Sequence, residues 1–361
     1  MSDMIVDSAE MGAGEKQSRR TASTRFAWSM QLSWLDREHL DDRDVAGAVA
    51  LHEAARLVDS PHQLVGPTLF SYRTFLKQGW DGDPPHTALA RDEKGRVVGV
   101  LQLTLPHWDN THLGVVDVTV DPLARRQGIG RRLFEAGCER VRAEGRRLVI
   151  TDCWADSPGV RFAEAMGLER AAVGVQRRQD LRALDWPRLD AEYAAAETRA
   201  GGYELMRIAG PTPEQMLPDV AAMVAAINDA PFDDLDIEDE VFTPERVGRF
   251  ERAQVAARMR TYRVIARERE TGVLGGHTMV AVDAEHPGYA SQYDTSVLRA
   301  HRGHRLGRLL KIDMLQWLAD AEPQLRLLDT WNAASNDHMI EVNEVLGYQV
   351  VATGIEWQLH L

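Results

Sequence analysis

One continuous stretch decides the fold: Val118-Thr119-Val120-Asp121-Pro122-Leu123-Ala124-Arg125-Arg126-Gln127-Gly128-Ile129-Gly130-Arg131. It starts as the end of an apolar strand, passes through a basic turn, and takes up a helical pattern at Gly128. The two glycines allow close backbone approach, so successive N–H groups can point at a phosphate. The start of the following helix adds partial positive charge at the same place. The stretch therefore predicts an anion-binding turn between a strand and a helix.

Two other interpretations of this turn are weaker. A dinucleotide-binding loop needs Gly-x-Gly-x-x-Gly, and Leu133 stands where the third glycine belongs. A basic turn before a solvated helix would carry no function. The second of these is disfavoured because the same turn recurs later in the chain.

The chain repeats its own pattern at an offset of roughly 175 residues. The matching segments, in the same order, are 90–99 with 266–275, 125–130 with 302–307, and 166–168 with 346–348. Several matches in one order indicate a duplicated domain rather than a short-period array. The second turn keeps Arg302 and Gly307 but has Arg305 in place of the first glycine. This change adds positive charge and removes backbone freedom, which puts the geometry of the second turn in question.

With a strand, an Arg-rich glycine turn and a helix in each copy, the sequence resembles the GNAT superfamily of N-acetyltransferases, in the tandem actinobacterial type that includes mycothiol synthase. The resemblance implies an α/β fold of two tandem GNAT domains, each a twisted mixed β-sheet flanked by helices. It implies acetyl-CoA as the acyl-donor substrate, with its pyrophosphate at the turn and its pantetheine arm along the preceding strand, and no metal. The donor-binding residues that it implies are Val118, Val120, Arg125, Arg126, Gln127, Gly128, Ile129, Gly130 and Arg131 in the first copy, and Val297, Arg302, Gly303, His304, Leu306, Gly307, Arg308 and Asn336 in the second.

Composition and periodicity predict how the chain is divided. We expect a disordered tail over 1–27, a first GNAT domain over 28–182, a linker over 183–202 and a second GNAT domain over 203–361. In the linker, Asp185 is expected to cap a helix that has Pro187 in its first turn. In the first domain the patterns predict strands at 87–91, 97–105 and 113–120, and helices after 42, around 72–76, from 128, and over 157–166.

Two aspartates at matching positions are the candidate catalytic residues. Asp117 and Asp294 each lie three residues before the valine that ends the strand. Polyamine acetyltransferases of the family carry an aspartate at the similar position, near the acceptor amine. The amine must lose a proton before it attacks, so a base is required. The alternative for either residue is an aspartate that faces solvent or pairs with a neighbouring arginine.

The resemblance leaves the acid that protonates the departing thiolate open. The family's tyrosine position holds Ala163 in the first copy and Asn343 in the second. The family's CoA-contacting asparagine is Asp156 in the first copy, whereas the second copy keeps Asn336. The remaining candidates for the acid are water, Tyr293 and Tyr348.

The net charge of −13 restricts the partners. Non-specific nucleic-acid or anionic-membrane binding needs a basic surface, and no stretch approaches the roughly 18 apolar residues of a membrane span. Cys138 and Cys153 form neither a disulfide framework nor a zinc pattern, so a cytoplasmic location is expected. The acidic run 229–240 predicts a loop, which is either a solvated surface or a rim that attracts a cationic acceptor.

These observations predict an acetyl-CoA-dependent N-acetyltransferase. The acceptor is expected to be a primary amine of a small, cationic molecule that attacks directly in a ternary complex. No nucleic-acid or membrane partner is expected, and the protein acts as a monomer or homodimer. A non-catalytic acyl-CoA-binding sensor or scaffold is the alternative, because both copies lack the tyrosine. Asn336 and the acidic run favour the second copy as the catalytic one.

Overall fold

The computed structural model describes residues 31–361, and the tail expected over 1–27 lies outside this range. The first half contains β1 (Gln31–Trp34), α1 (Asp42–Asp59), α2 (Leu69–Gln78), β2 (His86–Arg91), β3 (Val97–Thr104), β4 (Leu113–Val120), α3 (Ile129–Ala143), β5 (Leu148–Trp154), α4 (Gly159–Ala165) and β6 (Glu169–Asp180). The second half contains α5 (Trp186–Arg199), β7 (Tyr203–Ala209), α6 (Leu217–Val224), α7 (Pro244–Ala256), β8 (Met259–Glu268), β9 (Leu274–Asp283), β10 (Tyr289–Val297), α8 (Leu306–Ala321), β11 (Leu327–Ala333), α9 (Asp337–Val345) and β12 (Gln349–His360).

The predicted elements of both halves are present. The strand expected at 113–120 is β4, and the helix expected after the glycine turn is α3. In the linker, the Asp185 side chain accepts a hydrogen bond from the Arg188 N–H and caps α5, as expected. Helix α5 is more than a connection, because Leu189 and Ala196 are buried in the core of the second half.

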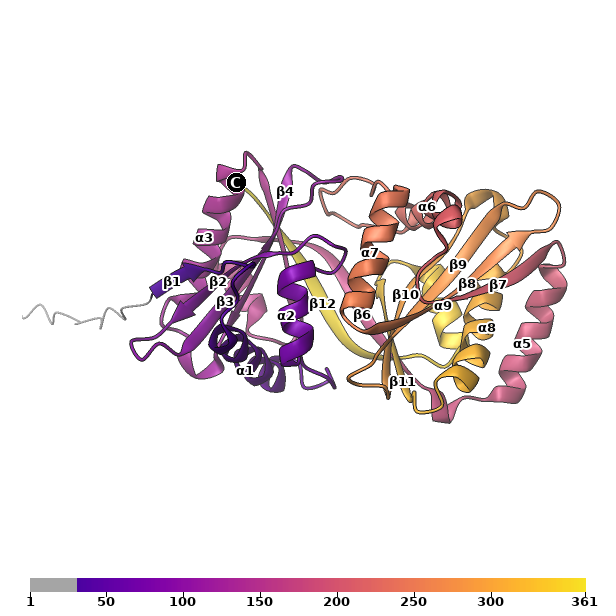
Figure 1. The fold of residues 1–361 in the computed structure, drawn as a ribbon, viewed down its shortest axis with the longest axis horizontal. Helices are drawn as coiled ribbons and strands as arrows, with labels where there is room; N and C mark the ends of the chain where they lie inside the picture. The colour runs from indigo at the N-terminus through magenta and orange to yellow at the C-terminus, as the bar shows by residue number, and fades with distance from the viewer. Residues whose placement is uncertain (1–30) are drawn as a thin grey trace, which may run out of the picture.

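The strands within residues 31–361 join in one 12-stranded sheet, in the order β1-β2-β3-β4-β5-β12-β6-β11-β10-β9-β8-β7. The order shows that the halves exchange their last strands. Strand β12 ends the chain but pairs with β5 of the first half, and β6 pairs with β11 of the second half. The two exchanged strands also pair antiparallel with each other at the middle of the sheet. Figure 1 shows β12 crossing into the first half, where the C-terminus lies.

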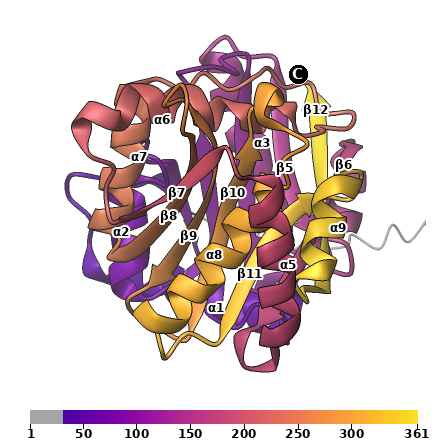
Figure 2. The same ribbon diagram turned by 90° about the vertical axis from the view of Figure 1, so that its right-hand side faces the viewer.

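Helices cover both faces of the sheet in each half (Figure 2). One face of the first half packs on α1 and α2 around Leu51, Leu76 and Val100. The other face packs on α3 and α4 around Leu133 and Phe134. The second half repeats this arrangement: α6 and α7 pack on one face of its strands, and α5, α8 and α9 pack on the other. Within residues 31–361, no helix has the length and apolar character needed to cross a lipid bilayer.

Candidate active site

Each half of the sheet opens into a gap between two parallel strands. Strands β4 and β5 pair only over residues 113–115 and 148–150, and β10 and β11 only over 289–291 and 327–329. Beyond these pairs the strands separate. The Asp121 N–H donates to the Val98 carbonyl on β3 at 3.0 Å, so by strand alternation the N–H and C=O groups of Val118 and Val120 turn toward the gap. A ligand laid along β4 therefore meets unpaired backbone groups.

The turn between β4 and α3 contains two left-handed residues. Arg126 has a φ of 65° and Gly128 a φ of 85°. The second copy shows the same pair, with Gly303 at 84° and Arg305 at 57°. The glycine therefore occupies the second left-handed position in the first turn and the first left-handed position in the second turn. The backbone path of the second turn is kept despite Arg305, which answers the question raised by its sequence.

Replacing Arg305 by glycine is expected to stabilise the protein by about 0.5–1 kcal/mol. A left-handed conformation costs a residue with a Cβ about 1–2 kcal/mol, and glycine's larger entropy in the unfolded chain offsets part of the gain. Chemical denaturation would measure the difference. Arg305→Ala is the control, because it removes the side chain but keeps the Cβ. An equal gain in both variants would show that the side chain, not the backbone, is the cause.

An arginine–aspartate pair anchors the base of each turn. Arg125 donates to both carboxylate oxygens of Asp59, at 2.8 and 2.5 Å, and its Nε donates to the Val120 carbonyl at 3.2 Å. In the second copy Arg302 makes the same two contacts, with Asp229 and with the Val297 carbonyl. These arginines therefore fix the turn to the preceding helical segment. The exposed Arg126 and Arg131 are the more available cations for a phosphate.

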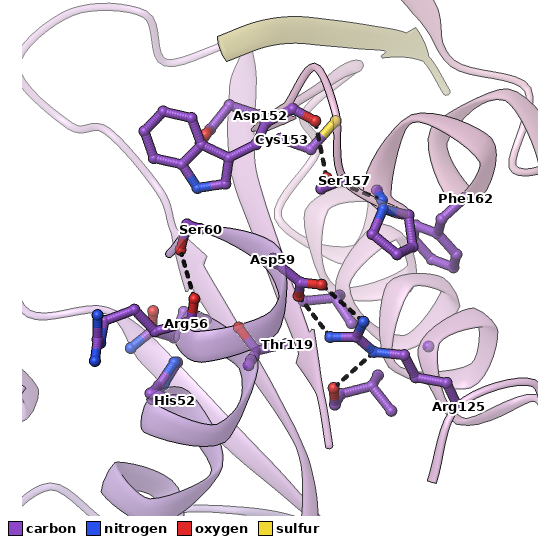
Figure 3. Close-up of a pocket in the computed structure, with 18 of the residues that line it drawn as sticks. His52, Arg56, Asp59, Ser60, Thr119, Arg125, Asp152, Cys153, Ser157 and Phe162 are labelled. Carbon is purple, nitrogen blue, oxygen red and sulfur yellow. Dashed lines mark hydrogen bonds and ion pairs between the residues drawn. The ribbon is translucent and has the colours of Figure 1, made fainter. Parts of the chain in front are cut away.

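A pocket of about 1470 Å³ lies in the first half and extends from this turn, past the gap, to α1 and α2 (Figure 3). Its size exceeds the roughly 300–1,000 Å³ of most small-molecule sites, so it has room for two substrates. A Cβ placed on Gly128 would meet no atom within 4 Å, which leaves the turn open to the pocket. The pocket brings together every donor-binding residue expected in the first copy: Val118, Val120, Arg125, Arg126, Gln127, Gly128, Ile129, Gly130 and Arg131.

The residues expected to bind the donor in the second copy lie in the other half, away from this pocket, and several are committed to other contacts. Arg308 pairs with Glu192 of α5 at 2.7 Å and with Glu341 at 3.4 Å. Leu306 is buried in the core. Asn336 caps α9 by accepting a hydrogen bond from the Met339 N–H. The others are Val297, which packs on the core of the second half, and Arg302, Gly303, His304 and Gly307 in the turn.

Carboxylates lie side by side at the gap in the first half. Burial and the neighbouring Asp152 raise the pKa of Asp117 to about 7. Asp152, on β5, is exposed to the pocket that it lines, and desolvation by the surrounding protein raises its pKa. Glu356 of the exchanged strand β12 stands directly opposite Asp152, and burial followed by the charge of Asp152 raises its pKa. Within residues 31–361, none of the three pairs with an arginine or lysine. These three carboxyl groups can therefore attract a cation, and one of them can accept a proton from it.

A second polar group lies on the side of α1 and α2. Tyr72 is hydrogen-bonded to His52 at 3.3 Å and accepts from Gln102 at 3.4 Å, and all three residues line the pocket. Burial lowers the pKa of His52 to about 4, so its imidazole is neutral at pH 7. The sequence analysis missed these residues and Asp152. Gln102 carries one indirect signal, because it lies opposite Asp117 in the β3–β4 hairpin.

Asp294 has different surroundings from Asp117. It lies at a β-bulge between Gln292 and Thr295 of β10, whereas the β3–β4 register runs without interruption past Asp117. Burial raises the pKa of Asp294, and the buried Arg263 opposes this effect. Arg263 also pairs with Glu251 at 3.1 Å. The structure therefore places the two candidate aspartates in separate sites, and Asp117 is the one that lies beside pocket-lining residues, Val118 and Asp152.

The tyrosines considered for the thiolate acid do not line this pocket. The Tyr293 hydroxyl donates to Gln254 at 3.1 Å. Tyr348 is buried, with its ring 4.8 Å from the Lys311 ammonium. Asn343, at the family's tyrosine position, accepts a hydrogen bond from Lys311 at 2.7 Å and donates to Asn332 at 2.6 Å. A buried polar network thus fills this part of the second half.

Comparison with known proteins agrees with this geometry. The sequence profile of the acetyltransferase (GNAT) family matches residues 51–168, which include β4, the glycine turn and α3. A solved tandem GNAT protein from the clavulanic acid biosynthesis pathway is 28% identical, and the alignment covers 92% of this chain and 98% of that one with a TM-score of 0.75. Residues 51–168 are therefore a GNAT acetyltransferase domain. The chain is a tandem GNAT acyltransferase with one GNAT domain in each half.

More distant structures share the fold of this tandem GNAT protein. A GCN5-related N-acetyltransferase from Sphaerobacter thermophilus is 15% identical, with coverage of 92% and 95% and a TM-score of 0.62. A putative acetyltransferase from Pyrococcus horikoshii is 13% identical, with coverage of 92% and 89% and a TM-score of 0.55. A search of curated protein sequences finds no match.

The acidic run of this GNAT protein is a loop, as predicted, and it contacts the other half. The Glu238 N–H donates to Asn110 at 2.7 Å, the Asp236 N–H donates to Gln358 at 3.0 Å, and His112 contacts the Asp236 carbonyl at 2.9 Å. The loop therefore ties the second half to the first. None of its residues lines the large pocket, so the geometry gives no support to the rim expected for the acceptor.

Proposed function

We propose that the protein is an acetyl-CoA-dependent N-acetyltransferase whose reaction takes place in the first half. The observation that carries this assignment is a pocket that contains the glycine turn, the open edge of β4 and Asp152, the carboxylate beside Asp117. The family profile also matches this half. The assignment reverses the preference for the second copy that Asn336 and the acidic run suggested.

The donor is proposed to bind from the turn into the gap. Backbone N–H groups around Gly128 and the start of α3 are suited to a pyrophosphate. Arg126 and Arg131 add mobile positive charge beside them. The pantetheine arm then follows β4, where the backbone groups of Val118 and the Val120 N–H face the gap, while the Val120 carbonyl is held by Arg125. Asp156 is exposed at the segment before α4, so its charge is screened by solvent and does not prevent this binding mode.

The acceptor is proposed to be a primary amine of a small, cationic molecule. Asp152 opens onto the pocket and Asp117 lies beside it, so a cationic group that enters past α1 and α2 meets negative charge at the gap. The lining on this side includes His52, Tyr72 and Gln102, which offer hydrogen bonds without adding positive charge at pH 7. Arg56 also lines this side, and its charge is paired with Glu53 at 2.7 Å. A cation is therefore favoured over an anion of the same size.

The chemistry is a direct transfer. An ammonium group gives one proton to Asp117, whose pKa of about 7 suits a base at neutral pH. The neutral nitrogen attacks the thioester carbonyl, and a backbone N–H of β4 stabilises the oxyanion. The C–S bond then breaks, the nitrogen's second proton passes to the sulfur, and the products are the amide, CoA thiol and one proton released to solvent.

The test is turnover of acetyl-CoA with a panel of small amines. Release of free thiol that depends on the amine, with an acetylated product of matching mass, is the expected result. The competing function is a non-catalytic acyl-CoA sensor or scaffold, which would bind acetyl-CoA without amine-dependent thiol release. Native mass spectrometry of the purified protein would identify a bound acceptor or donor directly.

A further inference from the structure

The segment between α1 and α2, residues 60–68, forms one wall of the large pocket and has no helix or strand of its own. The residues that it contributes to the lining are Ser60, Gln63, Val65, Gly66 and Pro67. From within the first half, the Arg56 guanidinium donates to the Gln63 carbonyl. An irregular segment with few bonds of its own depends on outside contacts for a defined shape.

Two of those contacts come from β6, the strand that the first half sends into the second; at the end of the segment, Thr68 also donates to Glu285 of the second half. The Gln63 side-chain amide donates to Oε1 of Gln176 at 3.0 Å. The Arg178 guanidinium donates to the His62 carbonyl at 3.1 Å. Both β6 side chains thus hold the segment where it borders the pocket.

Asp329 on β11, in the second half, fixes both of these side chains. It is 2% exposed and accepts hydrogen bonds from Arg178 Nε and Nη2, each at 2.6 Å, and from Gln176 Nε2 at 2.7 Å. The Tyr289 hydroxyl donates to it at 3.0 Å. Hydrogen bonding to the carboxylate raises the pKa of Arg178, so the guanidinium stays charged. A buried, fully occupied carboxylate of this kind defines one arrangement of its donors.

The charge of Asp329 also decides which way the Gln176 amide points. An ionised carboxylate can only accept, so Gln176 must turn its NH₂ toward Asp329 and its oxygen toward Gln63. That orientation is the one in which Gln63 can donate. An amide at position 329 could donate to Gln176 instead, and the oxygen would then no longer face Gln63.

We propose that Asp329 is a positioning residue for the acceptor side of the pocket: acting through Gln176 and Arg178, it lets the second half set the shape of residues 60–68. The inference rests on the proposed function, because the pocket must be the place of acetyl transfer for this wall to meet the acceptor. The donor turn is anchored separately by Asp59 and Arg125, so donor binding does not depend on Asp329.

The chain offers a matched control for the variant Asp329→Asn. Asp313 of α8 is 4% exposed and accepts two hydrogen bonds from Arg207, at 2.8 and 2.9 Å, and one from the Tyr193 hydroxyl. It is therefore another buried carboxylate with a bidentate arginine and a tyrosine, but it has no contact with residues 60–68. Asp313→Asn should disturb the second half about as much as Asp329→Asn does.

The first measurement is hydrogen exchange of the full-length protein with CoA present. The amides of residues 60–68 are expected to exchange at least about tenfold faster in Asp329→Asn than in Asp313→Asn. The second measurement is steady-state kinetics with 1,4-diaminobutane as the acceptor probe. The KM for the diamine is expected to rise about tenfold in Asp329→Asn, with the KM for acetyl-CoA within twofold of the parent protein.

A double-mutant cycle with Gln63→Ala separates positioning from a general loss of stability. If Asp329 acts through Gln63, the two changes together should raise the KM little more than either one alone. Equal exchange in the two aspartate variants, or additive effects in the cycle, would overturn the inference. Faster exchange without any turnover would support the role of Asp329 and reject the proposed acetyl transfer. Should Asp329→Asn fail to fold, Gln63→Ala alone must produce the same exchange and the same KM change.

Discussion

Replacing Gly128 by valine is expected to weaken acetyl-CoA binding to the first half by about 100-fold, because it removes the turn's ability to present two or more N–H groups to a phosphate. Gly128 has a φ of 85°, which a β-branched residue rarely adopts. The added side chain would also enter the open space in front of the turn. Isothermal titration with acetyl-CoA measures the effect.

Arg305→Val is the matched control for this experiment. It places the same β-branched residue at the equivalent left-handed position of the second turn. If the first half holds the donor, Arg305→Val should leave the affinity within about twofold of the parent protein. Loss of binding in Arg305→Val, with Gly128→Val unaffected, would move the donor site to the second half.

Replacing Asp117 by asparagine is expected to lower kcat by about 10²–10⁴-fold, the usual cost of losing a general base. Asp294→Asn should change kcat less than about twofold, because Asp294 lies at a separate site in the second half, at the bulge of β10. In the parent protein the rate should rise with pH through about 7, since only ionised Asp117 can accept the proton. A loss confined to Asp294→Asn would place the chemistry in the second half.

The same residue gives a prediction about stability. Asp117 has a pKa of about 7 in the folded protein and near 3.9 in an unfolded chain, so between these values the folded state binds more protons. The parent protein should therefore lose stability as pH rises from about 4 to 7. Asp117→Asn lacks this loss, and its stability relative to the parent should increase from pH 4 to pH 8. Urea denaturation at the two pH values measures the difference, and an unchanged difference would show that Asp117 is not held in its protonated form.

Local patterns were enough to predict much of the fold. The strand that ends at Val120, the turn around Gly128 and the Asp185 cap are each encoded within a few residues, and each is found where the sequence placed it. The repeat also predicted that the second half would contain a counterpart of the first turn. Its left-handed Arg305 shows that a backbone path can persist when the glycine that marks it has moved.

The partners of these elements could not be predicted in the same way. That β12 lies beside β5 depends on contacts between residues roughly 200 positions apart, and no local pattern encodes such a pairing. No local sequence pattern therefore indicated that Glu356 lies next to Asp152. Tyr72 and His52 belong to an ordinary helical pattern, and only packing brings them into the pocket. The acidic run was recognised as a loop, but its contact with Asn110 follows from the docking of the two halves.

The exchange of final strands also orders the events of protein synthesis. When the ribosome has made β5, the neighbour of that strand is still missing, and it is supplied only by residues 349–360. Until then β5 has a bare edge of the kind that invites pairing with other chains. The first half therefore cannot mature before the second, although domains usually fold in the order in which they emerge. A nascent chain that stops before β12 is left with an incomplete sheet in its earliest-made part, which makes it a target for chaperones and proteases.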